Sequence, residues 1–222
     1  MCGRFAITLP VDAMARLFEA VPGNDVPGEA RYNVCPTTPV AVCTAGDGER
    51  RLRAMRWGFV PHWYKTPTDG PLLINARSET IAEKPAFRAA CRERRCLIPA
   101  DGFYEWTRAE GQVPLPWYIH RADGAPLVFG GIWQEWEREG HDRIATCAVV
   151  TCAAGPGMDA IHDREPLVLE PADWPLWLGE AGHGAARLMK AAAPGVLAWH
   201  RVGTEVNSNR ASGPQLIAPV AA

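Results

Sequence analysis

The chain has 222 residues, of which 23 are Lys or Arg and 25 are Asp or Glu, so its formal net charge at pH 7 is −2. This balance gives no overall attraction to nucleic acid, and any phosphate binding has to come from a local group of arginines. No apolar run is long enough to cross a membrane and the first residues lack a signal-peptide pattern, so we expect a soluble, cytoplasmic protein with no membrane partner.

The composition predicts one domain over residues 1–222, because no linker-like run divides the chain. Twenty prolines and 21 glycines spread along it indicate many short strands and turns. We therefore expect an α+β fold with a β-rich, barrel-like core and peripheral helices. The seven cysteines lack paired spacing and the six histidines form no ligand motif, which predicts reduced thiols, no metal and no cofactor.

Cys2 is the first residue with distinctive chemistry. If Met1 is removed, Cys2 presents an α-amine and a thiol on adjacent carbons, and an unperturbed α-amine has a pKa of about 7.7–8.0. The amine can form an imine with an aldehyde, after which the sulfur can close a five-membered thiazolidine ring. The thiol alone can act in acyl transfer. The alternative is that Cys2 is a small apolar residue leading into the first strand.

Short elements follow. The pattern predicts a strand over 4–8, a helix over 11–20 with one apolar face, and a hairpin whose strands 39–44 and 52–57 are joined by the turn 46–48. The next segment, 57–64, is aromatic and interrupted by Gly and Pro, which predicts a shaped loop. It either covers one end of the core or, through Trp63, offers a platform for an unstacked base.

Asn75-Ala76-Arg77 follows a short apolar strand that we expect over 72–74. Ser78 is a suitable N-cap for a helix that begins near Glu79. Asn75 and Arg77 would then lie at a strand-to-helix junction and face an opening.

Glu105 lies between Tyr104 and Trp106 in a strand expected over 102–106, after another strand over 96–99. Its side chain points away from both aromatic rings. It therefore either faces water or lies in a pocket that shifts its pKa, and the sequence alone favours water.

His162 and Arg164 lie in a connection before Pro166. A histidine beside an arginine in such a loop can donate a proton or contact an anion, and the alternative is a solvated surface loop. We expect the remaining strands over 115–119, 127–133, 144–152, 167–169 and 196–206 and the remaining helices over 86–92, 172–178 and 184–192.

These motifs, taken in order, resemble the SOS-response-associated peptidase (SRAP) family, also described as abasic-site processing proteins. The matching pieces are Met1-Cys2-Gly3-Arg4-Phe5, Tyr32-Asn33 with Pro36, Trp57-Gly58, Leu73-Ile74-Asn75-Ala76-Arg77, Asp101-Gly102 with Glu105-Trp106, Ile161-His162-Asp163-Arg164 and Trp199-His200. Two departures are the spacing from Trp63 to Leu72 and the presence of Glu165 before the proline.

The resemblance implies a protein that senses abasic sites in single-stranded DNA and forms a thiazolidine crosslink through Cys2. It also implies autocatalytic removal of Met1, lyase-like chemistry, a monomer, and association with the nucleoid when bound to DNA. By the same resemblance Glu105 is the general acid/base, His162 protonates the sugar oxygen and Asn75 orients the aldehyde. The implied DNA contacts are Arg4, Arg77 and Arg164 to phosphates and Trp106 and Trp63 to bases.

Three other functions fit parts of the pattern. An N-terminal nucleophile hydrolase would use Cys2 for acyl transfer, but Arg4 follows Gly3 and the chain has no Asn-Gly pair. A thiol peptidase could combine Cys2, His162 and Glu105, although it would not need a free α-amine. A non-catalytic nucleic-acid-binding module would only pack Cys2 in its core.

Overall fold

The computed structural model describes residues 2–107 and 110–220. Its strands are β1 (Phe5–Ile7), β2 (Ala20–Pro22), β3 (Arg31–Val34), β4 (Pro39–Gly46), β5 (Glu49–Trp57), β6 (Asn75–Arg77), β7 (Arg95–Ala100), β8 (Gly102–Thr107), β9 (Leu115–Arg121), β10 (Leu127–Trp136), β11 (Ile144–Ala153), β12 (Arg164–Pro166) and β13 (Leu197–Arg201). Its helices are α1 (Val11–Phe18), α2 (Arg88–Glu93) and α3 (Trp174–Leu178), with short 3₁₀ turns η1 (Met158–Ala160), η2 (Pro171–Asp173), η3 (Ala185–Leu188), η4 (Thr204–Asn207) and η5 (Pro214–Ile217).

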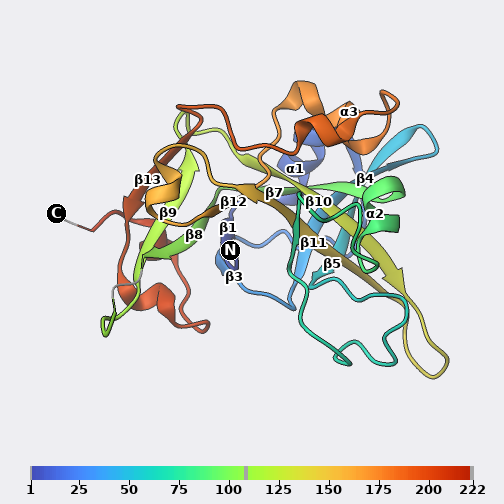
Figure 1. Cartoon of the computed structure of the whole chain (residues 1–222), viewed down its shortest axis with the longest axis horizontal. Helices are drawn as coiled ribbons and strands as arrows, with labels where there is room; N and C mark the ends of the chain where they lie inside the picture. The colour runs from blue at the N-terminus through green and yellow to red at the C-terminus, as the bar shows by residue number, and fades with distance from the viewer. Residues whose placement is uncertain (1, 108–109, 221–222) are drawn as a thin grey trace.

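The larger sheet closes on itself. Its strand order is β12-β11-β10-β7-β4-β5-β2, and β5 also pairs in parallel with β11. Strands β11, β10, β7, β4 and β5 thus form a ring around a buried apolar interior, with α1, α2 and α3 outside it (Figure 1). The expected β-rich core with peripheral helices is confirmed. No helix within the described residues combines the length and the apolar character needed to cross a membrane.

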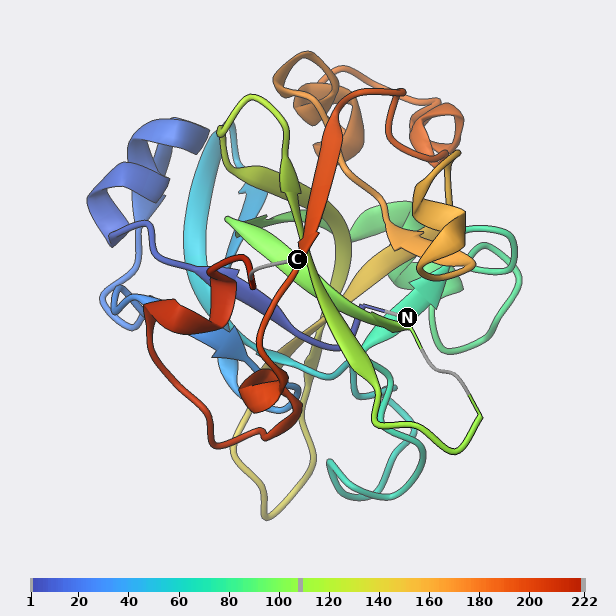
Figure 2. The same cartoon turned by 90° about the vertical axis from the view of Figure 1, so that its left-hand side faces the viewer.

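The second sheet carries the start of the chain. Its order is β13-β9-β8-β1-β3, so β1 lies between β8 and β3 and pairs antiparallel with both. Figure 2 shows the C-terminal segments crossing in front of β8 and β9. These segments contribute to a small apolar group, here called the C-terminal cluster, formed by Ala6, Tyr104, Tyr118, Val202, Val206 and Leu216. Both faces of this sheet are therefore covered near β8, because Phe103 lies in the main core on the other side.

The predicted hairpin is correct and slightly longer than expected. Strands β4 and β5 pair from Pro39 opposite Arg56 to Gly46 opposite Glu49. At the turn Asp47 has φ 53° and Gly48 has φ 79°, a left-handed conformation that Gly adopts freely and Asp tolerates better than most residues. The local turn residues therefore determine this register.

Three predicted elements are wrong. No helix begins near Glu79, because the Ser78 backbone N–H donates to the Thr151 carbonyl at 2.8 Å and extends the strand pairing instead of capping a helix. The strand expected over 72–74 is replaced by β6, which pairs in parallel with β11. The strand expected over 167–169 is displaced to β12, which pairs with β11 over 164–166, and Val168 keeps only an isolated antiparallel bridge to Phe129 on β10.

The C-terminal half departs from expectation in smaller ways. The strand expected over 196–206 ends at Arg201, where β13 gives way to η4, and the helix expected over 184–192 is reduced to η3. The helix expected over 172–178 forms as η2 and α3. Trp174, Leu176 and Trp177 are buried and pack this peripheral helix against the main core.

Candidate active site around Cys2

Cys2 is fully buried just before β1. Its thiol lies 4.0 Å from the Arg4 carbonyl, which also accepts a hydrogen bond from the Tyr104 backbone N–H at 3.0 Å. Burial, reinforced by the negative charge of Glu105, raises the pKa of the Cys2 thiol. The sulfur is therefore held as a neutral thiol at neutral pH, and a neighbouring base has to take its proton before it can act as a nucleophile.

Asn75 fixes the backbone of Cys2. Its side-chain Nδ2 donates a hydrogen bond of 2.8 Å to the Cys2 carbonyl. The other end of the amide, Oδ1, is buried and accepts no hydrogen bond from any of the described residues. Because an unpaired buried acceptor is costly, Oδ1 is available to accept a hydrogen bond from a substrate hydroxyl.

Glu105 is buried on β8, where only 3% of it is exposed, so the expectation that it faces water is wrong. Its side chain lies on the same face of β8 as Phe103, which packs in the main core, while the opposite face carries Tyr104 and the C-terminal cluster. Burial raises the pKa of Glu105, and the proximity of His162 opposes this shift. A carboxyl group with a raised pKa beside a thiol is suited to proton transfer.

His162 completes this group of side chains. The backbone N–H of Arg164 donates to its Nδ1 at 3.0 Å, and the carboxylate of Asp163 lies 2.9 Å from the same nitrogen. A neutral ring cannot both accept and donate at Nδ1. We assign Nδ1 as the acceptor, because β12 fixes the Arg164 N–H whereas the Asp163 side chain is 85% exposed. Nε2 then carries the proton and is the donor.

Arg164 is held inside the protein. Its guanidinium forms an ion pair with Glu79, with hydrogen bonds of 2.6 and 2.9 Å, and donates to the Thr151 carbonyl at 2.7 Å. These contacts join β12 to β11 and to the segment after β6. The phosphate contact expected for Arg164 remains a prediction, and here its charge already has a partner.

Arg4 and Trp106 are also engaged with each other. The Arg4 guanidinium lies 4.9 Å from the centre of the Trp106 ring and donates to the Asn207 carbonyl at 3.3 Å. Trp106 donates from Nε1 to Asn207 Oδ1 at 2.6 Å. Together with Pro114, these residues line a cavity of about 220 Å³. One face of the Trp106 ring is therefore already covered, and its expected base contact remains a prediction.

Arg77 and Trp63 lie near Asn75, around one cavity. Arg77 is exposed at the end of β6, and within residues 2–107 and 110–220 no hydrogen bond or ion pair holds its guanidinium. Trp63 is exposed in the irregular segment after β5. Both line a cavity of about 610 Å³ that also reaches Asn75.

Glu165 is a buried residue whose role the sequence did not reveal. It is 1% exposed, and its carboxylate accepts hydrogen bonds from the backbone N–H groups of Gly155 at 2.9 Å and Ala192 at 2.7 Å. Glu165 follows the loop that carries His162. The bond from Gly155 ties the two ends of that loop together, and the bond from Ala192 ties them to the segment before β13. In the sequence, the local signal was an acidic residue directly before Pro166 and the apolar run that follows it.

The described residues contain no group of three or more His, Cys, Asp or Glu side chains arranged to hold a metal ion. The candidate site consists of Cys2, Asn75, Glu105 and His162, which the start of the chain before β1, strands β6 and β8, and the loop before β12 bring together. Elements that are far apart in the sequence supply these four side chains.

Residues 1–209 match the family model described as SOS response associated peptidase (SRAP). The chain is 36% identical over 229 residues to the abasic site processing protein YedK of Escherichia coli, covering 99% of this chain and 100% of that protein. It is 29% identical over 273 residues to the abasic site processing protein HMCES of Pongo abelii, covering 99% of this chain and 76% of that protein. A solved structure from Bacteroides thetaiotaomicron superposes with a TM-score of 0.87 at 22% identity, covering 99% of this chain and 100% of that one, and supports the fold.

Proposed function

The chain belongs to the SOS response associated peptidase (SRAP) family, and on this premise we propose that it processes abasic sites in DNA by bonding covalently to the damaged sugar through Cys2. The observation that carries the proposal is the group formed by a buried Cys2, the Asn75 amide on its carbonyl and the buried Glu105. Relatives across nearly the whole chain are named abasic site processing proteins, which supports the same activity.

Removal of Met1 is the first step of this proposal. Hydrolysis of the bond between Met1 and Cys2 consumes one water and leaves Cys2 with a free α-amine. The family description includes peptidase activity, and this supports removal by the protein itself. Mass spectrometry of protein with Cys2→Ala or Glu105→Gln tests this step, since an autocatalytic reaction leaves Met1 in place when its machinery is removed.

Crosslinking then proceeds in two bond-forming steps. The α-amine adds to the aldehyde carbon of the opened sugar, and loss of one water gives an imine. The Cys2 sulfur adds to the imine carbon while its proton passes to the nitrogen, which closes a thiazolidine. Two carbons separate nitrogen from sulfur, so the second step has a high effective molarity.

Glu105 is the proposed general acid and base in both steps. Its raised pKa keeps a proton available for the hydroxide that leaves during imine formation. The resulting carboxylate can then accept the thiol proton of Cys2 and pass it to the nitrogen. Thus one buried group serves consecutive steps without an external acid.

His162 and Asn75 are proposed to act on the sugar. His162 donates from Nε2 to the ring oxygen as the bond between that oxygen and the anomeric carbon breaks, while the anomeric hydroxyl loses its proton to water and becomes the aldehyde oxygen. The hydroxyl formed there can donate to Asn75 Oδ1, the buried acceptor. Asn75 thereby holds the substrate and the Cys2 backbone with opposite ends of one amide.

Single-stranded DNA is the proposed substrate, because inserting protein beside a lesion costs less where no complementary strand must be unpaired. Arg4, Arg77 and Arg164 are proposed phosphate contacts, and of these Arg77 is the one with an exposed guanidinium and no partner in the described part of the chain. We further propose that the protein acts as a monomer in the cytoplasm and joins the nucleoid when bound to DNA.

One experiment tests the function. The protein is incubated with single-stranded oligonucleotides that contain or lack an abasic site, and a heat-stable complex is sought by denaturing electrophoresis. We expect it with wild-type protein on the abasic strand only and not with Cys2→Ala. Glutaminase or peptide hydrolysis without a DNA adduct would favour acyl transfer, and salt-sensitive binding without an adduct would favour a passive binding module.

A further inference from the structure

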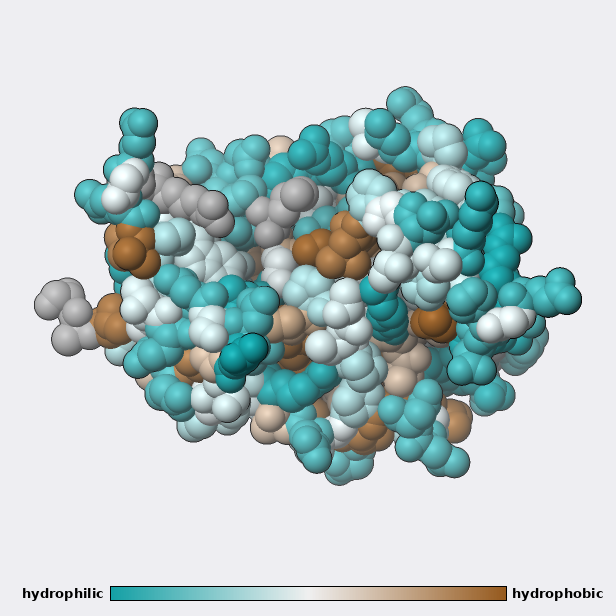
Figure 3. Space-filling view, turned by 90° about the horizontal axis from the view of Figure 1, so that it is seen from below, coloured by the Kyte–Doolittle hydropathy of each residue, from teal (hydrophilic) through white to brown (hydrophobic). Residues whose placement is uncertain are grey.

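Two acidic residues are buried within residues 2–107 and 110–220, namely Glu105, which is 3% exposed, and Glu165, which is 1% exposed. Acidic side chains ordinarily stay at the surface, and Figure 3 shows a face on which hydrophilic residues cover most of the area between separate hydrophobic patches. Glu105 belongs to the candidate active site, whereas the proposed reaction does not use Glu165. Because a buried carboxylate is costly unless polar groups surround it, its partners indicate what it holds in place.

Each oxygen of the Glu165 carboxylate accepts a hydrogen bond from one backbone N–H. Oε2 accepts from Gly155 at 2.9 Å, and Oε1 accepts from Ala192 at 2.7 Å. Gly155 lies at the start of the loop between β11 and β12 that carries His162. Ala192 lies in the segment 190–196 before β13, here called the connecting segment. One carboxylate thus joins the His162 loop to the C-terminal part of the chain.

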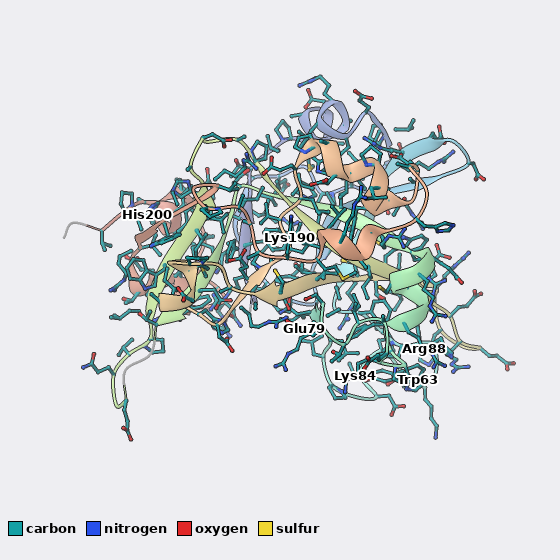
Figure 4. The ribbon with its side chains drawn as sticks, turned by 45° about the horizontal axis from the view of Figure 1, so that its top comes forward. Trp63, Glu79, Lys84, Arg88, Lys190 and His200 are labelled. Carbon is teal, nitrogen blue, oxygen red and sulfur yellow. The ribbon has the colours of Figure 1, made fainter. Side chains whose placement is uncertain are left out.

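The same loop also contacts β13. In Figure 4, Lys190 at the beginning of the connecting segment is labelled near the centre, and the segment leads from there to β13, where His200 is labelled toward the left. Gly157 in the loop has φ 90°, and a Cβ at this position would lie 2.9 Å from the ring of Trp199 on β13. The loop therefore has two close contacts with the C-terminal part of the chain, one through Glu165 and one at Trp199.

A series of backbone hydrogen bonds connects Gly155 to His162. The Gly155 carbonyl accepts from the Asp159 N–H at 3.1 Å, which closes the turn that contains η1. In that turn the Met158 carbonyl accepts from the His162 N–H at 3.0 Å. Met158 is buried in the main core, so the turn cannot shift without displacing a core side chain. The Glu165 carboxylate thus fixes the start of a loop whose backbone hydrogen bonds set the position of His162.

We propose that Glu165 is a positioning residue that holds the loop so that Nε2 of His162 meets the ring oxygen of the abasic sugar. This inference rests on the proposed function. A misplacement of about 1 Å can cost about 100-fold in rate, so a proton donor carried by a loop needs such support. Backbone N–H groups engage both oxygens of Glu165, and it therefore acts on the reaction through His162. Its effect is confined to the opening of the sugar ring, the step assigned to His162.

The first test compares crosslinking rates on two single-stranded substrates at saturating protein. One contains a natural abasic site, which is mostly closed to a ring, and the other carries an open-chain aldehyde that lacks the 4′-hydroxyl and cannot form a ring. Glu165→Gln keeps the shape of the side chain but turns an NH₂ donor toward one of the two N–H groups. We expect it to slow crosslinking about 10- to 100-fold on the natural site and less than about twofold on the open-chain aldehyde. Equal slowing on both substrates, or none on either, would overturn the proposal.

A second test asks whether the effect passes through His162. In the His162→Ala background we expect Glu165→Gln to change the rate on the natural site by less than about twofold, because the effects of two residues that act on one step are not additive. The same slowing in both backgrounds would show that Glu165 acts independently of His162 and that the proposal is wrong. Glu180→Gln is the matched control, because the Glu180 carboxylate also accepts two hydrogen bonds, from Arg50 at 2.9 and 2.7 Å, and we expect it to alter neither rate. Melting curves set an assay temperature at which every variant is folded.

The outcome is separable from that of the proposed function. Without DNA, amide hydrogen exchange at His162 reports on the loop alone, and we expect it to be about 10-fold faster or more in Glu165→Gln and unchanged in Glu180→Gln. Unchanged exchange in Glu165→Gln would refute the positioning role even if wild-type protein crosslinks. If wild-type protein crosslinks neither substrate while Glu165→Gln still speeds exchange at His162, the covalent chemistry is refuted and the support of the loop by Glu165 stands.

Discussion

The side-chain amide of Asn75 donates a hydrogen bond of 2.8 Å to the backbone carbonyl of Cys2, so strand β6 orients the residue that carries the proposed chemistry. The two residues are 73 positions apart in the sequence. This bond joins the two sheets at the point where the chain begins, because β1 belongs to one sheet and β6 pairs with the other.

Replacement of Asn75 by Asp removes the donor and adds a negative charge beside the Cys2 carbonyl. We expect crosslinking to slow about 10- to 100-fold, the cost of leaving a buried acceptor unpaired, with unchanged affinity for undamaged single strands. Single-turnover crosslinking and anisotropy measure the two quantities. Asn24→Asp, at an exposed position, is the control, and equal rates for both variants would contradict the role of Asn75.

Replacement of Glu105 by Gln tests both catalysis and stability. Because burial raises the pKa of Glu105, the unfolded chain ionises at a lower pH than the folded one. Wild-type stability therefore falls as the pH rises from about 4.3, the unfolded value, through the raised folded value, and the deficit persists above it. Gln carries no charge, so we expect this variant to melt at a higher temperature than wild type at pH 8 and to lose that advantage near pH 4.

The same Glu105→Gln variant should crosslink about 10²- to 10⁴-fold more slowly, as is typical when a general acid or base is lost. Thermal melts at both pH values and crosslinking rates are measured on one preparation. Glu137→Gln, at an exposed position, should change neither. A pH-independent difference in melting temperature would show that Glu105 is not the group whose ionisation destabilises the fold.

Replacement of Arg77 by Ala should weaken binding to every single strand, with or without a lesion. A phosphate contact carries no sequence or damage information, and each one lost reduces the slope of log K against log salt by about 0.7 for single strands. Titrations at several salt concentrations measure this slope. Arg187→Ala removes another exposed arginine and is the control. A loss confined to abasic strands would instead place Arg77 on the sugar.

Replacement of Arg164 by Ala should destabilise the fold. The Arg164 side chain is only 12% exposed and bonds Glu79 and the Thr151 carbonyl. Loss of charged, partly buried hydrogen bonds costs about 1–3 kcal/mol, which lowers the melting temperature by roughly 2–12 °C for a chain of this size.

The control for Arg164 is Arg16→Ala, which breaks the ion pair with Asp12. Those side chains are 72% and 66% exposed, so screening by solvent leaves little expected change in stability. Differential scanning calorimetry compares the two variants. Similar melting temperatures would show that the Arg164 contacts add no stability and would leave its guanidinium free for phosphate.

Replacement of Glu165 by Ala should leave the buried N–H groups of Gly155 and Ala192 without their acceptor. Two hydrogen bonds to a charged group are worth about 3 kcal/mol or more together, so we expect the melting temperature to fall by at least about 6 °C. Glu165→Gln retains one acceptor oxygen and should lose less. A variant as stable as wild type would mean that water replaces the carboxylate at both N–H groups.

The hairpin of β4 and β5 shows how local information determines structure. The run of Val and Ala in β4 and the Gly46-Asp47-Gly48 turn specify both strands and their register, because the interacting residues are close in sequence. Helix α1 was likewise predictable from the spacing of Met14 and Phe18, which are buried. Such elements need no knowledge of distant partners.

Strand β6 shows where local information ends. The apolar run at 72–74 is more strand-like than Asn75-Ala76-Arg77, yet β11 offers its backbone partners to the latter. The side chain of Arg164 is a second example. Its guanidinium is bound by Glu79, a residue 85 positions away in the sequence, so the residues around Arg164 could not show that its charge is paired. Backbone and ion-pair partners this distant leave no trace in the periodicity of a segment.

By itself, the sequence established the α+β, β-rich fold, the hairpin, the first helix, and the residue types Cys2, Asn75, Glu105 and His162 that resemble one family. Only the tertiary structure placed Glu105 in the interior. Alternation along a strand separates two faces but cannot say which face is covered, and here the C-terminal cluster covers one face while the main core covers the other. The burial that raises the pKa of Glu105 is therefore a property of the assembled sheets and not of strand β8 alone.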